Sequence, residues 1–183
     1  MIDGFTPFPA DLAQRYRECG YWLDQPLGDY FRDRCEQYAD RIAVIFEGER
    51  VTYGALNQRV ERLARHFIRI GFKRLDRVIL QLPNTPEFLY VYLGFQRIGV
   101  ITLLALPPHR RNEIGHYVDF VDAVGYAAAA RAGDFNFVHM ARDIQAGSSG
   151  LRHLLILGDD APEGCISIGK LLATEPEPPK DVL

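Results

Sequence analysis

Helical and strand-like patterns alternate along this chain, and that alternation limits the folds open to it. The strongest helical pattern runs from Thr52 to Gly71, with apolar residues at the three- and four-residue spacing of one buried stripe. Apolar runs at 77–82, 100–106 and 151–157 are predicted to be strands, with helical patterns between them. Strands joined through helices of this length predict an α/β fold, a doubly wound, mostly parallel sheet flanked by helices.

Several helices carry recognisable start and stop residues. Thr52 is a typical N-cap, and Gly71 can take the left-handed conformation that ends a helix. The run 85–87, Thr-Pro-Glu, supplies an N-cap, a first-turn proline and an acid for the next helix. Its predicted inward residues are Phe88, Val91, Phe95 and Ile98. Two more helices are expected, one after the arginines at 110–111 and one near 137–145.

The chain divides into three predicted parts. Residues 1–25 form an aromatic-rich arm with a helix from Pro9 to about Gly20, whose predicted inner face holds Leu12, Tyr16 and Cys19. Residues 26–172 form the α/β portion, beginning with a helix to about Tyr38 and a hairpin that turns at Glu47-Gly48. Residues 173–183 are rich in Pro and Glu and are predicted to be a linker.

Composition excludes several classes of protein. Of the 183 residues, 48% are hydrophobic and 25% charged, which is an ordinary globular balance. The formal net charge of −3 gives no reason to expect nucleic acid as a partner. No stretch approaches the ~18 apolar residues that span a bilayer, so no membrane association is expected. The three cysteines lie far apart and are predicted to be reduced thiols of a cytoplasmic protein.

The stretch LALPPHRRNEI, residues 104–114, is the candidate ligand site. It follows an apolar strand, and doubly wound sheets bind ligands at the carboxyl ends of their strands. Pro107 and Pro108 stiffen the turn, and His109 and Arg110 are the candidate substrate-proximal residues. The same stretch also fits a packed or solvated corner without chemistry.

Other catalytic signatures are absent from the sequence. There is no G-x-G-x-x-G, no G-x-x-x-x-G-K-[ST] and no G-x-S-x-G, and the GSSG at 147–150 is predicted to be a flexible connection. The remaining histidines, His66, His116, His139 and His153, show no ligand pattern. We therefore assign no catalytic, cofactor-binding or metal-ligating residue.

The order of motifs resembles the aryl-acid-activating branch of the adenylate-forming superfamily. The matching residues are Thr52-Tyr53, Leu56 and Leu63-Ala64 for its "TY..L......LA" helix, Asp76-Arg77-Val78 for "GDRV", LPNTPEF at 82–88, and the Leu-Pro-x-His-Arg corner of the (2,3-dihydroxybenzoyl)adenylate synthases. Two departures stand out. Ala55 replaces the usual Glu of a capping box, and Leu75 replaces a frequent Gly, so that turn is expected to need no positive φ.

The resemblance implies an activity for a longer protein. It implies that ATP and Mg²⁺ convert 2,3-dihydroxybenzoate or salicylate to an aryl-adenylate, which is loaded on an aryl carrier protein in siderophore biosynthesis. The family's phosphate loop, aryl pocket and catalytic lysine are expected beyond a linker like 173–183, so this chain alone is predicted inactive. The corner is expected to shape the floor near the substrate pocket, more by packing than by chemistry.

Two alternatives remain open. One is another acyl-CoA or acyl-AMP ligase that shares the scaffold without the aryl pocket. The other is a truncated α/β module kept for interaction and without catalysis. The sequence leaves open which aryl acid is used and the oligomeric state.

Overall fold

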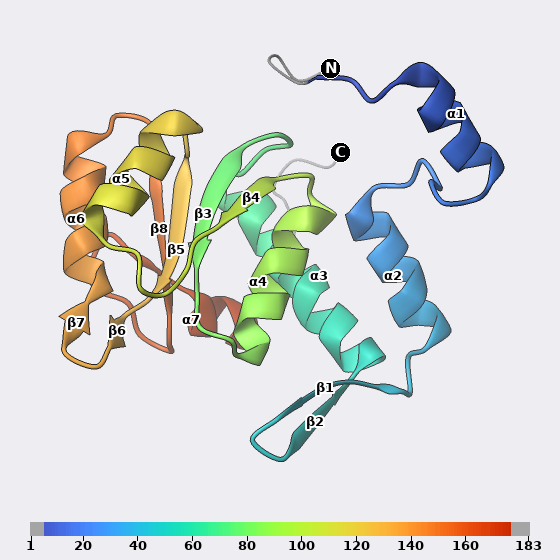
Figure 1. Cartoon of the computed structure of the whole chain (residues 1–183). Coiled ribbons are helices and arrows are strands. Elements are labelled where there is room, and N and C mark those ends of the chain that lie inside the picture. The colour runs from blue at the N-terminus through green and yellow to red at the C-terminus, as the bar shows by residue number, and fades with distance from the viewer. Residues whose placement is uncertain (1–5, 177–183) are drawn as a thin grey trace, which may run out of the picture.

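A computed structural model describes residues 6–176 and shows a five-stranded parallel sheet at the centre (Figure 1). The order across the sheet is β4-β3-β5-β8-β9, and every neighbouring pair is parallel. The strands are β3 Arg77–Gln81, β4 Ile101–Leu104, β5 Gly125–Ala129, β8 His153–Leu157 and β9 Ile166–Ser167. The predicted fold class is confirmed.

Helices cover both faces of this sheet (Figure 1). One face carries α3 (Tyr53–Ile70), α4 (Pro86–Arg97) and the short α7 (Ile168–Ala173). The other carries α5 (Arg111–Phe120) and α6 (Phe137–Gly147). Each layer has its own apolar core, so the sheet is buried between two helical layers.

Strand β3 shows how the two cores are separated. Successive side chains of a strand point to opposite faces. Val78 and Leu80 accordingly join the core under α3 and α4, whereas Ile79 joins the core under α5 and α6. All three are fully buried. Removing apolar surface from water contributes about 25 cal/mol per Å². Burial of both faces is therefore the main stabilising contribution in the sheet.

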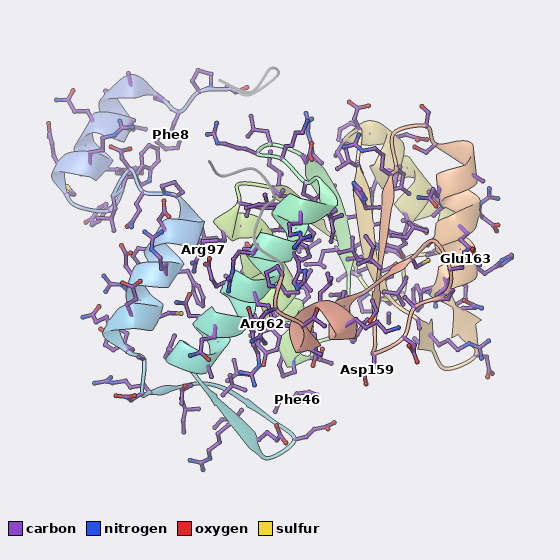
Figure 2. All side chains as sticks on the ribbon, turned by 180° about the vertical axis from the view of Figure 1, so that it is seen from behind. Phe8, Phe46, Arg62, Arg97, Asp159 and Glu163 are labelled. Atoms are coloured by element: carbon purple, nitrogen blue, oxygen red, sulfur yellow. The ribbon has the colours of Figure 1, made fainter. Side chains whose placement is uncertain are left out.

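The remaining elements lie outside the two layers. They are α1 (Ala10–Glu18), α2 (Leu27–Gln37), the antiparallel hairpin of β1 (Ile42–Phe46) with β2 (Glu49–Thr52), and the small hairpin of β6 (Arg131–Ala132) with β7 (Phe135–Asn136). Helix α2 packs beside α3 and α4, and α1 lies at the far end of the row (Figure 1). Seen from behind, Phe8 on the arm and Glu163 near α6 mark opposite sides of the molecule (Figure 2).

The predicted helix boundaries hold well at α3. The Thr52 hydroxyl accepts a hydrogen bond from the Ala55 amide at 3.2 Å, and Gly71 ends the helix with φ 106°. At α4 the predicted N-cap, Thr85, is at the right position but makes no side-chain capping bond. Its hydroxyl is buried without a hydrogen-bond partner.

The expectation for Leu75 is wrong. Its φ is 70°, in the left-handed region that favours glycine. The turn imposes this conformation: the Leu75 amide donates to Gly99 O at 2.8 Å, and the Asp76 carboxylate accepts from the Lys73 amide at 2.8 Å. The local cost of a leucine here is about 1–2 kcal/mol.

Three further expectations need correction. The strand predicted at 100–106 is shorter than expected: β4 covers only Ile101–Leu104, and it is the outermost strand on its side of the described sheet. Its Ile101 and Leu104 are 37% and 54% exposed. The chain crosses to the other side of β3 only after β4, so no described strand pairs with the outer edge of β4. On α1 the buried residue is Ala13, and Cys19 is exposed. The stretch 126–130, given no element by the sequence, is largely the central strand β5.

The predicted boundary at 172–173 falls at the end of α7. Residues 1–5 of the arm and 177–183 of the predicted linker lie outside the described residues. Arg62 on α3 donates to the Leu172 carbonyl in the last turn of α7 at 2.8 Å and to the Glu175 carboxylate just beyond α7 at 2.7 Å (Arg62 is labelled in Figure 2). No helix within 6–176 combines the length and the apolar character needed to cross a membrane.

Substituting alanine at Gly28 tests the contact between α2 and α4. A Cβ there would lie 2.6 Å from Gln96 O and 2.9 Å from Arg97 Cα, so the two helices must separate. We expect Gly28→Ala to lower the free energy of unfolding by about 1–3 kcal/mol in urea titrations. In the matched control, Gly115→Ala on α5, a Cβ meets nothing within 4 Å. This control should gain about 0.5–1 kcal/mol, and equal stability of the two variants would contradict the packing described.

The imidazole of His153 should make stability depend on pH. Burial lowers the pKa of His153 from 6.5, with the neighbouring Arg152 acting in the same direction. The unfolded chain therefore takes up a proton first as pH falls below 6.5, and stability decreases until the folded His153 also protonates. We expect His153→Gln to flatten this part of a urea-unfolding profile between pH 8 and pH 5.5. A profile of His153→Gln as steep as that of the native chain would contradict this assignment.

Candidate functional site

The carboxyl ends of the parallel strands gather at one edge of the sheet, where the candidate site lies. From β3 the chain returns to β4 on one side and then crosses to β5 on the other side of β3. This reversal of winding direction is the place where doubly wound sheets bind ligands. The segment that crosses it is the predicted corner, 105–110. The candidate stretch predicted from the sequence therefore lies at the carboxyl edge of the sheet.

The corner is a tight turn that closes on itself. The His109 amide donates to Leu106 O at 3.0 Å, and the Leu106 amide lies 3.3 Å from His109 Nδ1, which accepts its hydrogen. The half-buried His109 ring also meets Tyr117 edge-on, with ring centroids 5.6 Å apart. Pro107 and Pro108 are exposed and have no amide hydrogen to donate. The imidazole is thus held in one direction, with Nδ1 as the acceptor.

Arg110 supports the corner from the other side. Its Nη1 donates to Pro107 O and to His109 O, each at 2.9 Å. The guanidinium carbon lies 4.1 Å from the ring centre of Phe135 on β7 and 5.5 Å from that of Phe137 on α6. Helix α5 begins here because the Glu113 carboxylate accepts the Arg110 amide at 2.9 Å. Arg110 is therefore a structural link between the corner and the β6–β7 hairpin.

A buried glutamine, Gln81, reaches the same corner from the end of β3. Its Nε2 donates to Leu106 O at 2.7 Å and to His109 O at 3.0 Å, and the phenol of Tyr126 donates to its Oε1. Sequence reasoning missed Gln81 and Tyr126. The available signal was a single amide side chain within the otherwise apolar run VILQL at 78–82.

The described residues do not fit the phosphates of ATP. The connection after β8 carries Asp159 and Asp160, and a hydrogen bond from Lys170 lowers the pKa of Asp160, which keeps it charged. Two carboxylates repel phosphate, and the connection after β3 is Leu-Pro-Asn-Thr rather than a glycine-rich loop. Within 6–176 no group of three or more His, Cys, Asp or Glu is arranged to hold a metal ion.

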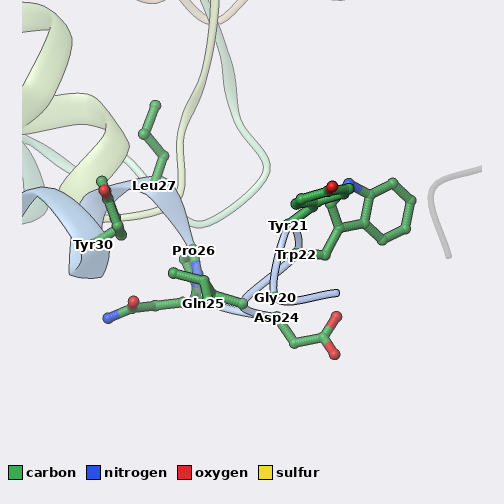
Figure 3. Close-up of a pocket in the computed structure, with 9 residues that line it drawn as sticks. Gly20, Tyr21, Trp22, Asp24, Gln25, Pro26, Leu27 and Tyr30 are labelled. Atoms are coloured by element: carbon green, nitrogen blue, oxygen red, sulfur yellow. The ribbon is translucent and has the colours of Figure 1, made fainter. Parts of the chain in front are cut away.

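Two surface hollows have no lining residue from the corner. One, of about 800 Å³, is lined by the continuous stretch 20–27 and Tyr30 (Figure 3). It is an open fold of the arm and has no contribution from the sheet. The other, of about 440 Å³, lies between the β1–β2 hairpin and α4. Its carboxylates Glu47, Glu49 and Glu87 surround a single cation, Arg59, and this charge disfavours an anionic ligand.

The other four histidines are dispersed, as expected. His66 Nε2 lies 2.8 Å from Thr174 O, and His139 lies 3.6 Å from the Asp143 carboxylate. His116 stacks on Phe120, and His153 packs against Phe72. Of the histidines described here, only His109 belongs to the corner.

The family described as AMP-binding enzyme matches residues 31–181. The chain belongs to this family. Helices α3 to α7, the whole sheet and most of α2 lie within the match, and the arm with α1 precedes it. The fold and the winding reversal at the corner are thus those of an AMP-binding enzyme.

Three relatives indicate which branch of the family this chain resembles. This AMP-binding enzyme chain is 45% identical over 159 residues to Triostin synthetase I of Streptomyces triostinicus, covering 87% of this chain and 29% of the relative. It is 36% identical to the 2,3-dihydroxybenzoate-AMP ligase of Bacillus subtilis, covering 87% of this chain and 30% of that protein. It is 36% identical over 189 residues to the salicyl-AMP ligase / salicyl-S-ArCP synthetase of Mycobacterium tuberculosis, covering 98% and 33%. The resemblance to the aryl-acid branch is confirmed.

A solved structure shows the same fold at similar identity. The apo structure of Mycobacterium smegmatis MbtA superposes with a TM-score of 0.82 at 35% identity, covering 98% of this chain and 33% of that one. The chain therefore spans about a third of the length of the relatives it matches.

Replacing Arg110 with lysine tests its linking role. A lysine keeps the charge but cannot donate to two carbonyls from a planar group while lying over Phe135. We expect Arg110→Lys to lower the free energy of unfolding by about 0.5–1.5 kcal/mol in thermal melts. Arg111→Lys, at the adjacent exposed position, is the matched control and should leave the melt unchanged. If Arg110→Lys leaves the free energy of unfolding unchanged, the contacts of Arg110 with Phe135 and the two carbonyls add no stability.

Proposed function

We propose that a protein containing this chain activates an aryl acid, 2,3-dihydroxybenzoate or salicylate, as its adenylate. The observation that carries the proposal is the 36% identity to both a 2,3-dihydroxybenzoate-AMP ligase and a salicyl-AMP ligase, which extends over most of this chain. The proposal is also supported by the Leu-Pro-Pro-His-Arg corner, which lies at the carboxyl edge of the sheet, the edge at which doubly wound sheets generally bind ligands.

ATP and Mg²⁺ belong to this proposal as the substrate and the metal of the reaction. A carboxylate oxygen of the acid attacks the α-phosphorus in line, a new C–O–P linkage forms, and the bond to pyrophosphate breaks. Rate enhancement in such a step comes mainly from positioning and from charge stabilisation. The described residues supply neither a phosphate loop nor a metal site. Their contribution is the rigid scaffold and the corner.

The second half-reaction and the partner are also proposed. The Mycobacterium tuberculosis relative is named as a salicyl-S-ArCP synthetase, which supports transfer of the aryl group to the thiol of an aryl carrier protein. A siderophore pathway is supported by the relative named as a Vibriobactin-specific 2,3-dihydroxybenzoate-AMP ligase. A cytoplasmic location fits the three free cysteines.

We further propose that the corner forms part of the floor of the acid pocket. His109 is held in one direction by its own turn, so it offers a fixed surface to a planar ring. Arg110 is engaged with two carbonyls and Phe135, which favours a supporting role over direct contact with the acid. Both residues act by shape in this proposal, and neither transfers a proton.

A second candidate is supported by the identity to Triostin synthetase I, which at 45% exceeds that to the two aryl acid-AMP ligases. In this second candidate, the activated acid becomes a building block of triostin, the product in the name of that relative. The two candidates share adenylate formation and differ in the acid.

ATP–pyrophosphate exchange tests the function. We expect the 183-residue chain alone to show no exchange above a no-enzyme blank, because scattered arginines do not replace a preorganised phosphate-binding loop. The natural gene product should exchange with 2,3-dihydroxybenzoate or salicylate and should not do so with an aliphatic acid of similar size.

The pattern of acids decides between the alternatives. Exchange with aliphatic acids alone would contradict the aryl proposal and favour a general acyl ligase. A folded gene product that is inactive with every acid would favour a non-catalytic interaction module. Exchange by the purified 183-residue chain would contradict the inferred need for a separate phosphate loop.

A further inference from the structure

The amide of Gln81 is placed where it can control the corner. The side chain is 2% exposed and stands at the carboxyl end of β3, directly under the crossing segment. Its Nε2 donates to Leu106 O at 2.7 Å and His109 O at 3.0 Å, with Pro107 O at 3.4 Å. Carbonyl oxygens accept but never donate. The NH₂ end of the amide must therefore face the corner.

Tyr126 fixes the opposite end of the same amide. Its phenol donates to Gln81 Oε1, and this tyrosine is fully buried in strand β5, next to β3 in the sheet. Burial raises the pKa of Tyr126, so the phenol keeps its proton and remains a donor throughout the physiological range. Two neighbouring strands thus determine which way the amide points.

The contacts extend from Gln81 to the His109 ring. His109 Nδ1 accepts from the Leu106 amide at 3.3 Å, so the ring direction depends on where the backbone of residues 106 and 109 lies. Both of these residues are held through their carbonyls by the Gln81 amide. A buried amide that only filled space would leave its donors without partners, at a cost of about 1–3 kcal/mol.

We propose that Gln81 is a positioning residue: its amide, oriented by Tyr126, sets the backbone of the corner and the direction of His109, and so the affinity for the acid. The statement about His109 stands on this chain alone. The statement about the acid rests on the proposed function. Gln81 itself touches no substrate in this scheme.

The decisive variant is Gln81→Glu, which keeps the size and shape of the side chain. An ionised carboxylate has no hydrogen to offer, and it faces three carbonyl oxygens. The matched control is Gln96→Glu, because Gln96 is a half-buried glutamine that donates to Thr102 Oγ1 at 3.2 Å, away from the corner. Tyr126→Phe is the second variant. It keeps the Gln81 donors and removes their orientation, so a folding failure of Gln81→Glu does not end the test.

The first readout is the ¹⁵N signal pair of His109 in the 183-residue chain above pH 8. The native chain and Gln96→Glu should show a single tautomer with the hydrogen on Nε2, because Nδ1 is an acceptor. Gln81→Glu should show a mixture of tautomers, and Tyr126→Phe a smaller change in the same direction. A variant that loses stability while His109 keeps its single tautomer would show a merely structural role and overturn the proposal.

The second readout is kinetic and uses the natural gene product. Gln81→Glu should raise KM for the aryl acid roughly tenfold and leave KM for ATP within about twofold, while Gln96→Glu changes neither. Equal increases in both constants, or no increase, would overturn the link to the acid. If His109 loses its single tautomer but the natural gene product activates no acid, the positioning of His109 is supported and the proposed function fails.

Discussion

The structure depends on burying both faces of its parallel sheet at once. Parallel strands need crossover connections, and the crossovers supply the helices that cover each face. The chain covers one face with α3, α4 and α7 and the other with α5 and α6. Changing from one face to the other forces the connection after β4 to pass over the carboxyl end of β3. The corner at 105–110 is that connection, so the position of the candidate site follows from the requirement for two covered faces.

The corner then needs partners for its backbone carbonyls. Two prolines remove backbone donors, while the carbonyls of Leu106, Pro107 and His109 remain as acceptors. Gln81 from below and Arg110 from the side satisfy them. Because the buried Gln81 amide would be costly to leave without partners, and a satisfied network is rigid, this arrangement limits the conformations of the corner. A rigid floor is what positioning of a small planar acid requires.

Side chains of α3 hold the end of α7 and the residues after it in a similar way. Arg62 binds the Leu172 carbonyl in the last turn of α7 and the Glu175 carboxylate just beyond it, and His66 contacts Thr174 O. Individual surface ion pairs contribute little, but several contacts to one short segment limit the directions it can take. The chain leaving α7 is thereby aligned with α3, in the same layer that covers the sheet.

The sequence by itself determined the fold class, the limits of α3 and the position of the corner, because apolar periodicity and capping residues are local signals. Motif spacing also indicated the aryl-acid branch. Only the tertiary structure decided that β4 is outermost, that the alanine-rich stretch 126–130 runs largely along the centre of the sheet, and that Leu75 takes a left-handed conformation. It also brought Gln81, Tyr126 and His109 together. Strand order and side-chain networks depend on residues distant in sequence, and no local pattern records them.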